Sequence, residues 1–353
     1  MKNRGSVYIL TGMCCDQEGE ESIYPQGLNI KSSSGQFQSI YWQCVVVFFA
    51  TSVRNNPSAN HILCTNAEKL PNLGNFNMEE FFANIGVKVA HLPFTYKHPL
   101  EYFDAFRSTY FKFDIVKYLK NNSESNDICM SLDSDCVWVN SVDRMREAIE
   151  KNGIATYERF YPEDQAINGL TRGEMQKIYS ELGYNIEQAP PYFGAEFIGG
   201  TGENIQKLSE EIDLIWNISL ERFAQGKSKF NTEEQMLTYI YNKQGYAAGT
   251  ANPYLERIWT SAQFYTASKS NFQLDVWHLP AEKTRGIKRL FLQVSNPKSL
   301  FWTLPVGEEF MKYIAGYVGI PKRNISKIIV ETLEARKSGI KRRLSHVKNL
   351  IKG

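Results

Sequence analysis

The chain has 353 residues, of which 42% are hydrophobic, 13% aromatic and 22% charged, and its formal net charge is +2. These values are ordinary for a folded soluble protein, and they exclude a disordered chain, a collagen-like repeat and a coiled coil. Dividing the length by ~150 residues per domain suggests about two domains, although one large α/β domain fits equally well.

The small net charge conceals an uneven distribution along the chain. Residues 322–353 hold ten Lys or Arg and two Glu. This segment therefore carries +8, and the total of +2 leaves −6 for the rest of the chain. A nearly neutral protein with a basic end suggests a separate role for that end.

The cysteines and the apolar segments bear on the cellular environment. None of the six cysteines has the C-x-x-C spacing and two are adjacent, which favours a reducing cytoplasm over a disulfide framework. Acidic residues from Asp16 onward follow the short apolar N-terminus too soon for a signal peptide. The most apolar stretch spans about a dozen residues, whereas a membrane span needs about 20. We therefore expect a cytoplasmic protein that does not span a membrane.

Hydrophobic periodicity predicts alternating strands and helices in the first half of the chain. We expect a loop at residues 16–35 and a helix over 101–120, where apolar residues recur at helical spacing. Other elements are strands at 6–11, 61–65, 87–91 and 128–132 and helices at 38–53, 79–85 and 143–151.

The second half continues the alternation. Strands are expected at 154–157 and 192–200, and helices at 173–182, 202–225 and 232–243. Strands and helices that alternate with short connections are typical of an α/β sheet flanked by helices. Because neither an internal repeat nor a Pro- or Gly-rich linker divides the sequence, we expect one catalytic domain over 1–320 and a basic segment over 321–353.

An acidic pair follows the strand predicted at 128–132. Asp133 and Asp135 stand two residues apart, between that strand and the apolar residues 136–139. Ligands bind at the carboxyl ends of strands in open α/β sheets. A divalent cation would relieve the repulsion between the two carboxylates and bridge them to phosphate oxygens. The alternative is a turn in which the aspartates only cap backbone groups.

This motif carries a resemblance to a known family. Residues 112–114 (KFD) and 128–135 (ICMSLDSD) resemble the core of GT-A glycosyltransferases. The resemblance implies a Rossmann-like mixed sheet flanked by helices. It also implies that the Asp-x-Asp binds Mn²⁺ or Mg²⁺ and the diphosphate of a nucleotide sugar, with Asp133 and Asp135 as metal ligands and Asp133 also in contact with the donor.

A second stretch, residues 192–201 (YFGAEFIGGT), is similar to part of glycosyltransferase family 6, the blood-group and α-1,3-galactosyltransferase family. The resemblance covers about residues 100–260. It departs from the family at Glu196, where the family has a small residue. In the family such a stretch lines the donor sugar, which assigns that role to Gly194, Ala195, Glu196, Gly199 and Gly200; the alternative for Glu196 is a paired surface acid. The alternative for the two last glycines is a strand-to-helix turn.

Residues 231–237 (NTEEQML) fall where family 6 has His-Asp-Glu, whose glutamate is the candidate nucleophile or transition-state stabiliser. By this resemblance Glu233 takes the catalytic role, although Asn-Thr replaces His-Asp before it. Glu234 and Glu196 offer further catalytic carboxylates. The alternative for Glu233 is a charge that only favours the start of a helix.

Four further residues complete the predicted site. Arg107 and Lys112 precede the strand that leads to the Asp-x-Asp motif. Similar enzymes use a basic residue at this place to hold the nucleotide or diphosphate; the alternative is a solvated helix face.

His278 resembles the third metal ligand of the glycogenin-like family, with Lys283 nearby to bind phosphate. The adjoining Gly and Lys-Pro-Trp elements of that pattern are absent, so a structural histidine is the alternative.

The basic segment has a helical pattern of its own. Ile340, Leu344, Val347 and Ile351 fall on one helical face, surrounded by lysines and arginines. Such a helix binds an anionic membrane surface. The alternatives are a solvated helix packed on the domain and a nucleic-acid site, and the second is disfavoured because aromatic residues are not interleaved with the basic ones. We expect peripheral association with the inner face of a membrane and no nucleic-acid partner.

Together these features predict a metal-dependent hexosyltransferase. It would move a sugar from a nucleotide-diphosphate sugar, a UDP-sugar by resemblance, to a glycan or lipid-linked acceptor. Two other hypotheses remain open. One is a module that binds nucleotide sugars or glycans without turnover, and the other is a nucleic-acid-associated protein that uses the basic segment.

Overall fold

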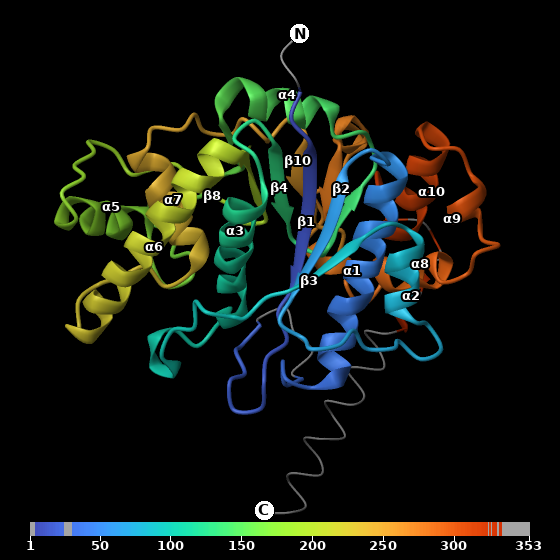
Figure 1. Ribbon diagram of the computed structural model, residues 1–353, viewed down its shortest axis with the longest axis horizontal. Coiled ribbons are helices and arrows are strands. Elements are labelled where there is room, and N and C mark those ends of the chain that lie inside the picture. The colour runs from blue at the N-terminus through green and yellow to red at the C-terminus, as the bar shows by residue number, and fades with distance from the viewer. Residues whose placement is uncertain (1–3, 25–29, 324, 326, 330–331, 334–353) are drawn as a thin grey trace, which may run out of the picture.

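The computed structural model describes residues 4–24, 30–323, 325, 327–329 and 332–333 (Figure 1). Among them, six strands form the main sheet in the order β3-β2-β1-β4-β9-β6. Their bounds are β1 (Val7–Met13), β2 (Asn60–Thr65), β3 (Lys88–His91), β4 (Ile128–Leu132), β6 (Ile154–Ala155) and β9 (Phe197–Thr201). The first four strands are parallel, whereas β9 is antiparallel to both β4 and β6. The mixed sheet predicted from the sequence is therefore confirmed.

Helices cover both faces of this sheet (Figure 1). Successive side chains of a strand point to opposite faces. Accordingly, Ile9 of β1 packs into a core that includes α1, α8 and α10, and Leu10 packs into a second core that includes α3, α6 and α7. The helices are α1 (Gly35–Asn55), α2 (Met78–Asn84), α3 (Phe111–Asn122), α4 (Asp143–Asn152), α5 (Arg172–Glu181), α6 (Gly202–Ala224), α7 (Glu233–Lys243), α8 (Gly286–Val294), α9 (Leu300–Thr303) and α10 (Glu308–Val318).

The helix predicted over 101–120 is wrong in its first half. Phe106 has a left-handed backbone with φ of 59°, a conformation that a right-handed helix does not contain. Arg107–Tyr110 then forms a 3₁₀ turn, and the α-helix begins only at Phe111. Arg107 therefore lies before the helix, whereas Lys112 lies in its first turn.

The strand predicted at 192–200 is broken into two. Tyr192–Phe193 (β8) pairs with Glu158–Arg159 (β7) in a small two-stranded sheet, and the main sheet takes only β9. Between them, a Cβ atom on Gly194 would lie 2.2 Å from a carboxylate oxygen of Glu196. A glycine is thus required where the Glu196 side chain approaches the backbone. The strand predicted at 154–157 is also shorter, since β6 ends at residue 155.

A three-stranded sheet that the sequence analysis did not predict adjoins the main sheet. It consists of β5 (Cys136–Trp138), β11 (Val276–His278) and β10 (Leu255–Arg257), in the order β10-β11-β5. Strand β11 runs antiparallel to β5 and pairs His278 with Cys136. This pairing places His278 next to the loop that carries Asp135.

The structure also bears on the cysteines, on membrane spans and on the basic segment. All six cysteines lie among the described residues and are free thiols there. Within the same part of the chain, none of the helices has the length and apolar character needed to cross a bilayer. The apolar face predicted over 340–351 lies outside the described residues. The boundary at residue 320 and the cellular compartment stay predictions.

Candidate metal and substrate site

The site is built on the loop at the carboxyl end of β4. The backbone N–H of Asp133 donates to the carbonyl of Glu196 (3.0 Å), and that of Cys136 donates to the carbonyl of Asp133 (3.1 Å). The carbonyl of Asp135 accepts from the N–H of Leu279 (3.0 Å). The loop is therefore fixed by the residue before β9 on one side and by the residue after β11 on the other.

Asp133, Asp135 and His278 converge in a group whose candidate ligand atoms all lie within 4.8 Å of one another. Nε2 of His278 is 3.3 Å from Oδ1 of Asp135 and 3.9 Å from Oδ2 of Asp133. Asp135 and His278 are buried, whereas Asp133 is half-buried. Two carboxylates and one imidazole are donors that Mn²⁺ and related divalent ions accept.

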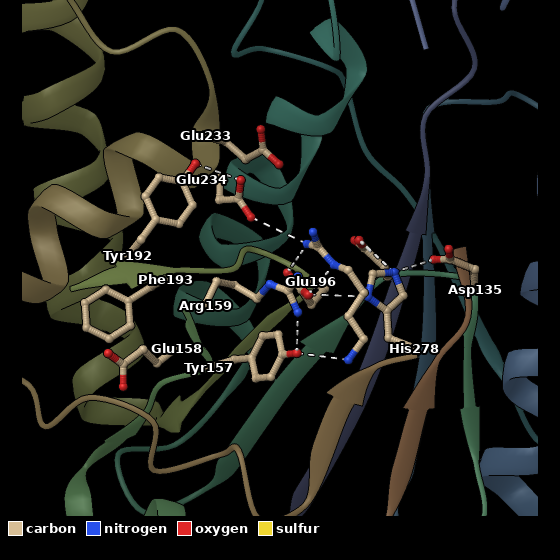
Figure 2. A network of polar contacts seen from close by, with 12 residues as sticks. Asp135, Tyr157, Glu158, Arg159, Tyr192, Phe193, Glu196, Glu233, Glu234 and His278 are labelled. Atoms are coloured by element: carbon tan, nitrogen blue, oxygen red, sulfur yellow. Dashed lines mark hydrogen bonds and ion pairs between the residues drawn. The ribbon is translucent and has the colours of Figure 1, made fainter. Parts of the chain in front are cut away.

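The other ring nitrogen of His278 faces Glu196, so that the imidazole lies between Glu196 and Asp135 (Figure 2). Nδ1 is 3.4 Å from Oε1 of Glu196. Both oxygens of this carboxylate also accept from Arg257, at 2.8 Å from Nε and 2.7 Å from Nη2. Histidine ligands of metals are usually oriented by such a contact from a carboxylate to the second nitrogen. The surroundings of His278 therefore suit a metal ligand.

Charge attraction outweighs burial in this network. Burial alone would raise the pKa of Glu196, but Arg257 and His278 hold it well below its usual range. Burial would likewise lower the pKa of His278, yet Asp135 and Glu196 raise it overall. Glu196 is thus an ionised carboxylate that is fully engaged within the protein.

Two lysines offset the negative charge of Asp133 and Asp135. Nζ of Lys112 lies 2.8 Å from Oδ1 of Asp133, and Nζ of Lys283 forms an ion pair with Asp135. Burial would lower the pKa of each lysine, but the adjacent carboxylates raise it. Both ammonium groups are therefore charged and lie beside the candidate metal group, where a diphosphate would need cations.

The two glutamates at the start of α7 differ in their partners. Oε2 of Glu233 accepts from the hydroxyl of Thr109 (2.5 Å), and Oε1 lies 3.4 Å from Nζ of Lys112. Glu234 accepts from the hydroxyl of Tyr192 (2.8 Å) and lies 3.6 Å from Arg257. Burial and the charges of the neighbouring glutamates raise the pKa of Glu234, although Arg257 opposes this.

These groups share one cavity of about 380 Å³. Most of the residues predicted from the sequence line it: Lys112, Asp133, Asp135, Ala195, Glu196, Glu233, Glu234, His278 and Lys283.

Four predicted residues do not line this cavity. Gly199 and Gly200 lie within β9, where added Cβ atoms would meet the ring of Phe197 at 2.2 Å and the side chain of Ile154 at 2.5 Å. These glycines therefore allow close packing inside the sheet, rather than the approach of a sugar. Gly194 leaves room for Glu196, as described above.

Arg107 is the fourth residue away from the cavity. Its guanidinium is buried and donates through Nη2 to the backbone carbonyl of His98 (2.9 Å). This contact holds the guanidinium at His98, and Arg107 is not part of the cavity lining. The prediction that Arg107 holds the nucleotide or diphosphate has no support in this geometry.

Sequence reasoning missed Arg257, which pairs with Glu196 across 61 residues of sequence. It also missed Tyr161 and Asn168, which line the cavity. Asn168 has a left-handed backbone with φ of 50°, a conformation that asparagine adopts more readily than most residues. The dipeptide Asn168-Gly169 is a turn signal, but in sequence it does not indicate a site.

No family model matches the chain, and no curated protein matches it in sequence. Among solved structures, the chain is similar to the apo structure of WbbM, described as a bifunctional glycosyltransferase, with a TM-score of 0.48 and 10% sequence identity. The match covers 79% of this chain and 46% of that one, so the chain spans about half of its length. A likeness at this level does not assign an activity.

The pair of Glu196 and Arg257 generates a prediction about stability. Arg257→Met leaves a buried carboxylate without its partner, and we expect it to lower the free energy of unfolding by about 3–5 kcal/mol. The double variant Glu196→Gln/Arg257→Met removes both charges and should lose less than Arg257→Met alone. Urea denaturation followed by circular dichroism measures both losses. A double variant less stable than Arg257→Met would contradict the proposed pairing.

Proposed function

We propose that the chain is a metal-dependent glycosyltransferase that moves a sugar from a nucleotide-diphosphate sugar to a glycan or lipid-linked acceptor. The observation that carries this proposal is the group of Asp133, Asp135 and His278 at the carboxyl end of β4, beside two charged lysines in one cavity. The resemblance of the Asp-x-Asp motif to GT-A enzymes points in the same direction.

The metal is proposed to be Mn²⁺ or Mg²⁺, held by Asp133, Asp135 and His278. The contact between Glu196 and the second nitrogen of His278 supports this fit, because it leaves Nε2 directed at the two aspartates. When bound, such an ion neutralises the charge that develops on a leaving diphosphate.

The donor is proposed to be a UDP-sugar. Lys112 and Lys283 would bind its diphosphate, since their ammonium groups lie at the acidic pair. The nucleoside would lie toward the carboxyl end of β1, where the same cavity is lined by aromatic side chains: Tyr24, Phe37, Tyr41 and Phe106.

Of the three candidate catalytic carboxylates, Glu233 is the one we propose. Both oxygens of Glu196 are held by Arg257, so this residue instead positions His278. Glu234 is tied to Tyr192 and Arg257. Glu233 accepts from Thr109 and forms an ion pair with Lys112 of the proposed diphosphate site, which places it beside the proposed leaving group. A carboxylate at the anomeric carbon acts as the nucleophile in a retaining reaction or as the base in an inverting one.

A membrane partner is also proposed, on the basis of the chain after α10. Among the described residues of this segment, Lys327 is buried and forms an ion pair with Glu282, which fixes the segment to the body. Four aliphatic side chains there are exposed, Ile325 by 77%, Ile329 by 52%, and also Ile328 and Leu333. In sequence, seven basic residues and one acid follow over 334–353. An apolar face followed by positive charge suits an anionic lipid surface.

Turnover is the first test of the proposed function. With Mn²⁺ present, the protein should hydrolyse or transfer from a UDP-sugar, and release of UDP should fall by about 100-fold or more in Asp135→Asn, because the charge that binds the metal is lost. The exposed Asp143 provides a matched control, and Asp143→Asn should keep the activity. Binding of UDP without release from any UDP-sugar would favour a module without turnover. Full activity of Asp135→Asn, or after removal of divalent ions, would contradict the metal site.

Vesicle binding tests the membrane proposal. The protein should sediment with phosphatidylcholine vesicles that contain phosphatidylserine and not with phosphatidylcholine alone. Ile325→Asp/Ile329→Asp should lower the bound fraction by about tenfold or more, because two apolar side chains no longer enter the bilayer surface. Leu214, an exposed residue of α6, gives the control Leu214→Asp. Equal binding to both kinds of vesicle, or equal binding by the double variant, would refute this role.

A further inference from the structure

The cavity extends to two different sides of the acidic pair. On one side it is bounded by Tyr41 of α1, and on the other by Tyr161 and Asn168 near α7. Figure 1 shows α1 and α7 on opposite sides of β4. If the nucleoside lies beside α1, as proposed above, the space beside Tyr161 is left for the group that receives the sugar.

A second hollow of about 280 Å³ adjoins that end of the cavity. Tyr161 lines both spaces, so they meet at this residue. The hollow lies against the two-stranded sheet of β7 and β8, and Phe160, the residue after β7, contributes to its wall. The Phe160 side chain is 80% exposed. A single exposed aromatic ring is common on protein surfaces, so its meaning depends on how it is held and on what lies beside it.

The backbone around Phe160 is firmly held. Arg172 donates to the carbonyl of Tyr161 (2.8 Å) and to those of Ala189 (2.9 Å) and Pro190 (2.7 Å), which ties the chain after β7 to the chain before β8. The ring of Tyr161 packs edge-to-face on Tyr192, with centroids 5.4 Å apart. Phe160 is thus presented on a rigid base and needs little ordering when a ligand binds.

A polar group lies beside this aromatic surface. The Arg159 guanidinium stands 5.8 Å from the ring centroid of Tyr157 and 5.6 Å from that of Tyr161. Its Nη1 donates to the hydroxyl of Tyr157 (3.1 Å), and Figure 2 shows these two side chains near Glu196. Its Nε finds no hydrogen-bond partner among the described residues. An aromatic face next to an arginine suits a sugar ring, which has an apolar C–H face and a rim of hydroxyl groups.

We propose that this hollow is an acceptor subsite, and that the acceptor is an oligosaccharide of at least two sugar units. The unit that receives the new sugar would lie beside Tyr161 and Asn168, and the next unit would stack on Phe160 with its hydroxyls toward Arg159. The proposal rests on the proposed function for its meaning as an acceptor site, but the binding of sugar by the hollow can be measured without any donor.

Saturation-transfer NMR on the full chain, without nucleotide, tests this subsite. The probes are glucose and galactose as single sugars and maltose, cellobiose and lactose as disaccharides. At least one disaccharide should bind more tightly than its component monosaccharides, and Phe160→Ala should weaken that binding by about five- to tenfold. Phe160→Tyr, which keeps the ring, should retain the binding. The control Phe264→Ala removes another exposed ring (55%) that does not line either cavity.

The outcomes separate this inference from the proposed function. Disaccharide binding that depends on Phe160, in a protein that releases no UDP from any UDP-sugar, would support a sugar site and refute the transferase. Release of UDP together with disaccharide binding that is the same in wild type and Phe160→Ala would refute the subsite alone. Failure of every disaccharide to bind the wild type would also overturn the subsite.

Discussion

The structure around the cavity depends on the compensation of negative charge. Six carboxylates line this space, and like charges this close together are stable only when cations lie among them. Arg257 forms an ion pair with Glu196, and Lys112 and Lys283 form ion pairs with Asp133 and Asp135. The carboxylates are Asp16, Asp133, Asp135, Glu196, Glu233 and Glu234. The lysine contacts offset this negative charge, and in the proposed reaction a divalent ion and a diphosphate would lie among the same groups.

The site residues come together because several strands end or are interrupted beside the cavity. Strand β4 ends at the acidic pair, and the break after β8 turns Glu196 into the same space. The antiparallel pairing of β11 with β5 then adds His278, which lies 143 residues after Asp135 in the chain, and β10 adds Arg257 beside it. His278 and Arg257 lie in paired strands, and Asp133, Asp135 and Glu196 lie directly next to strands, so the fold itself positions these side chains.

Prediction from sequence succeeded where the signal was local. The buried strand 128–132 and the aspartates after it are adjacent in sequence, so one pattern indicates both the element and the site. It failed where distant residues decide the structure. A left-handed Phe106 interrupts a good helical pattern, and the run 192–200 is apolar enough for one strand but has to accommodate the Glu196 carboxylate. The partnership of Arg257 with Glu196 has no local signal at all.

The central claim is that Asp133, Asp135 and His278 together bind a divalent ion. It is tested most directly by a crystal structure of the protein with Mn²⁺ and UDP, using anomalous scattering to locate the manganese. Our account predicts an anomalous peak within bonding distance of all three side chains, with the diphosphate on its open side and Lys112 and Lys283 at the phosphates. UDP bound in the cavity without a peak at these residues, or a peak bound elsewhere, would contradict it.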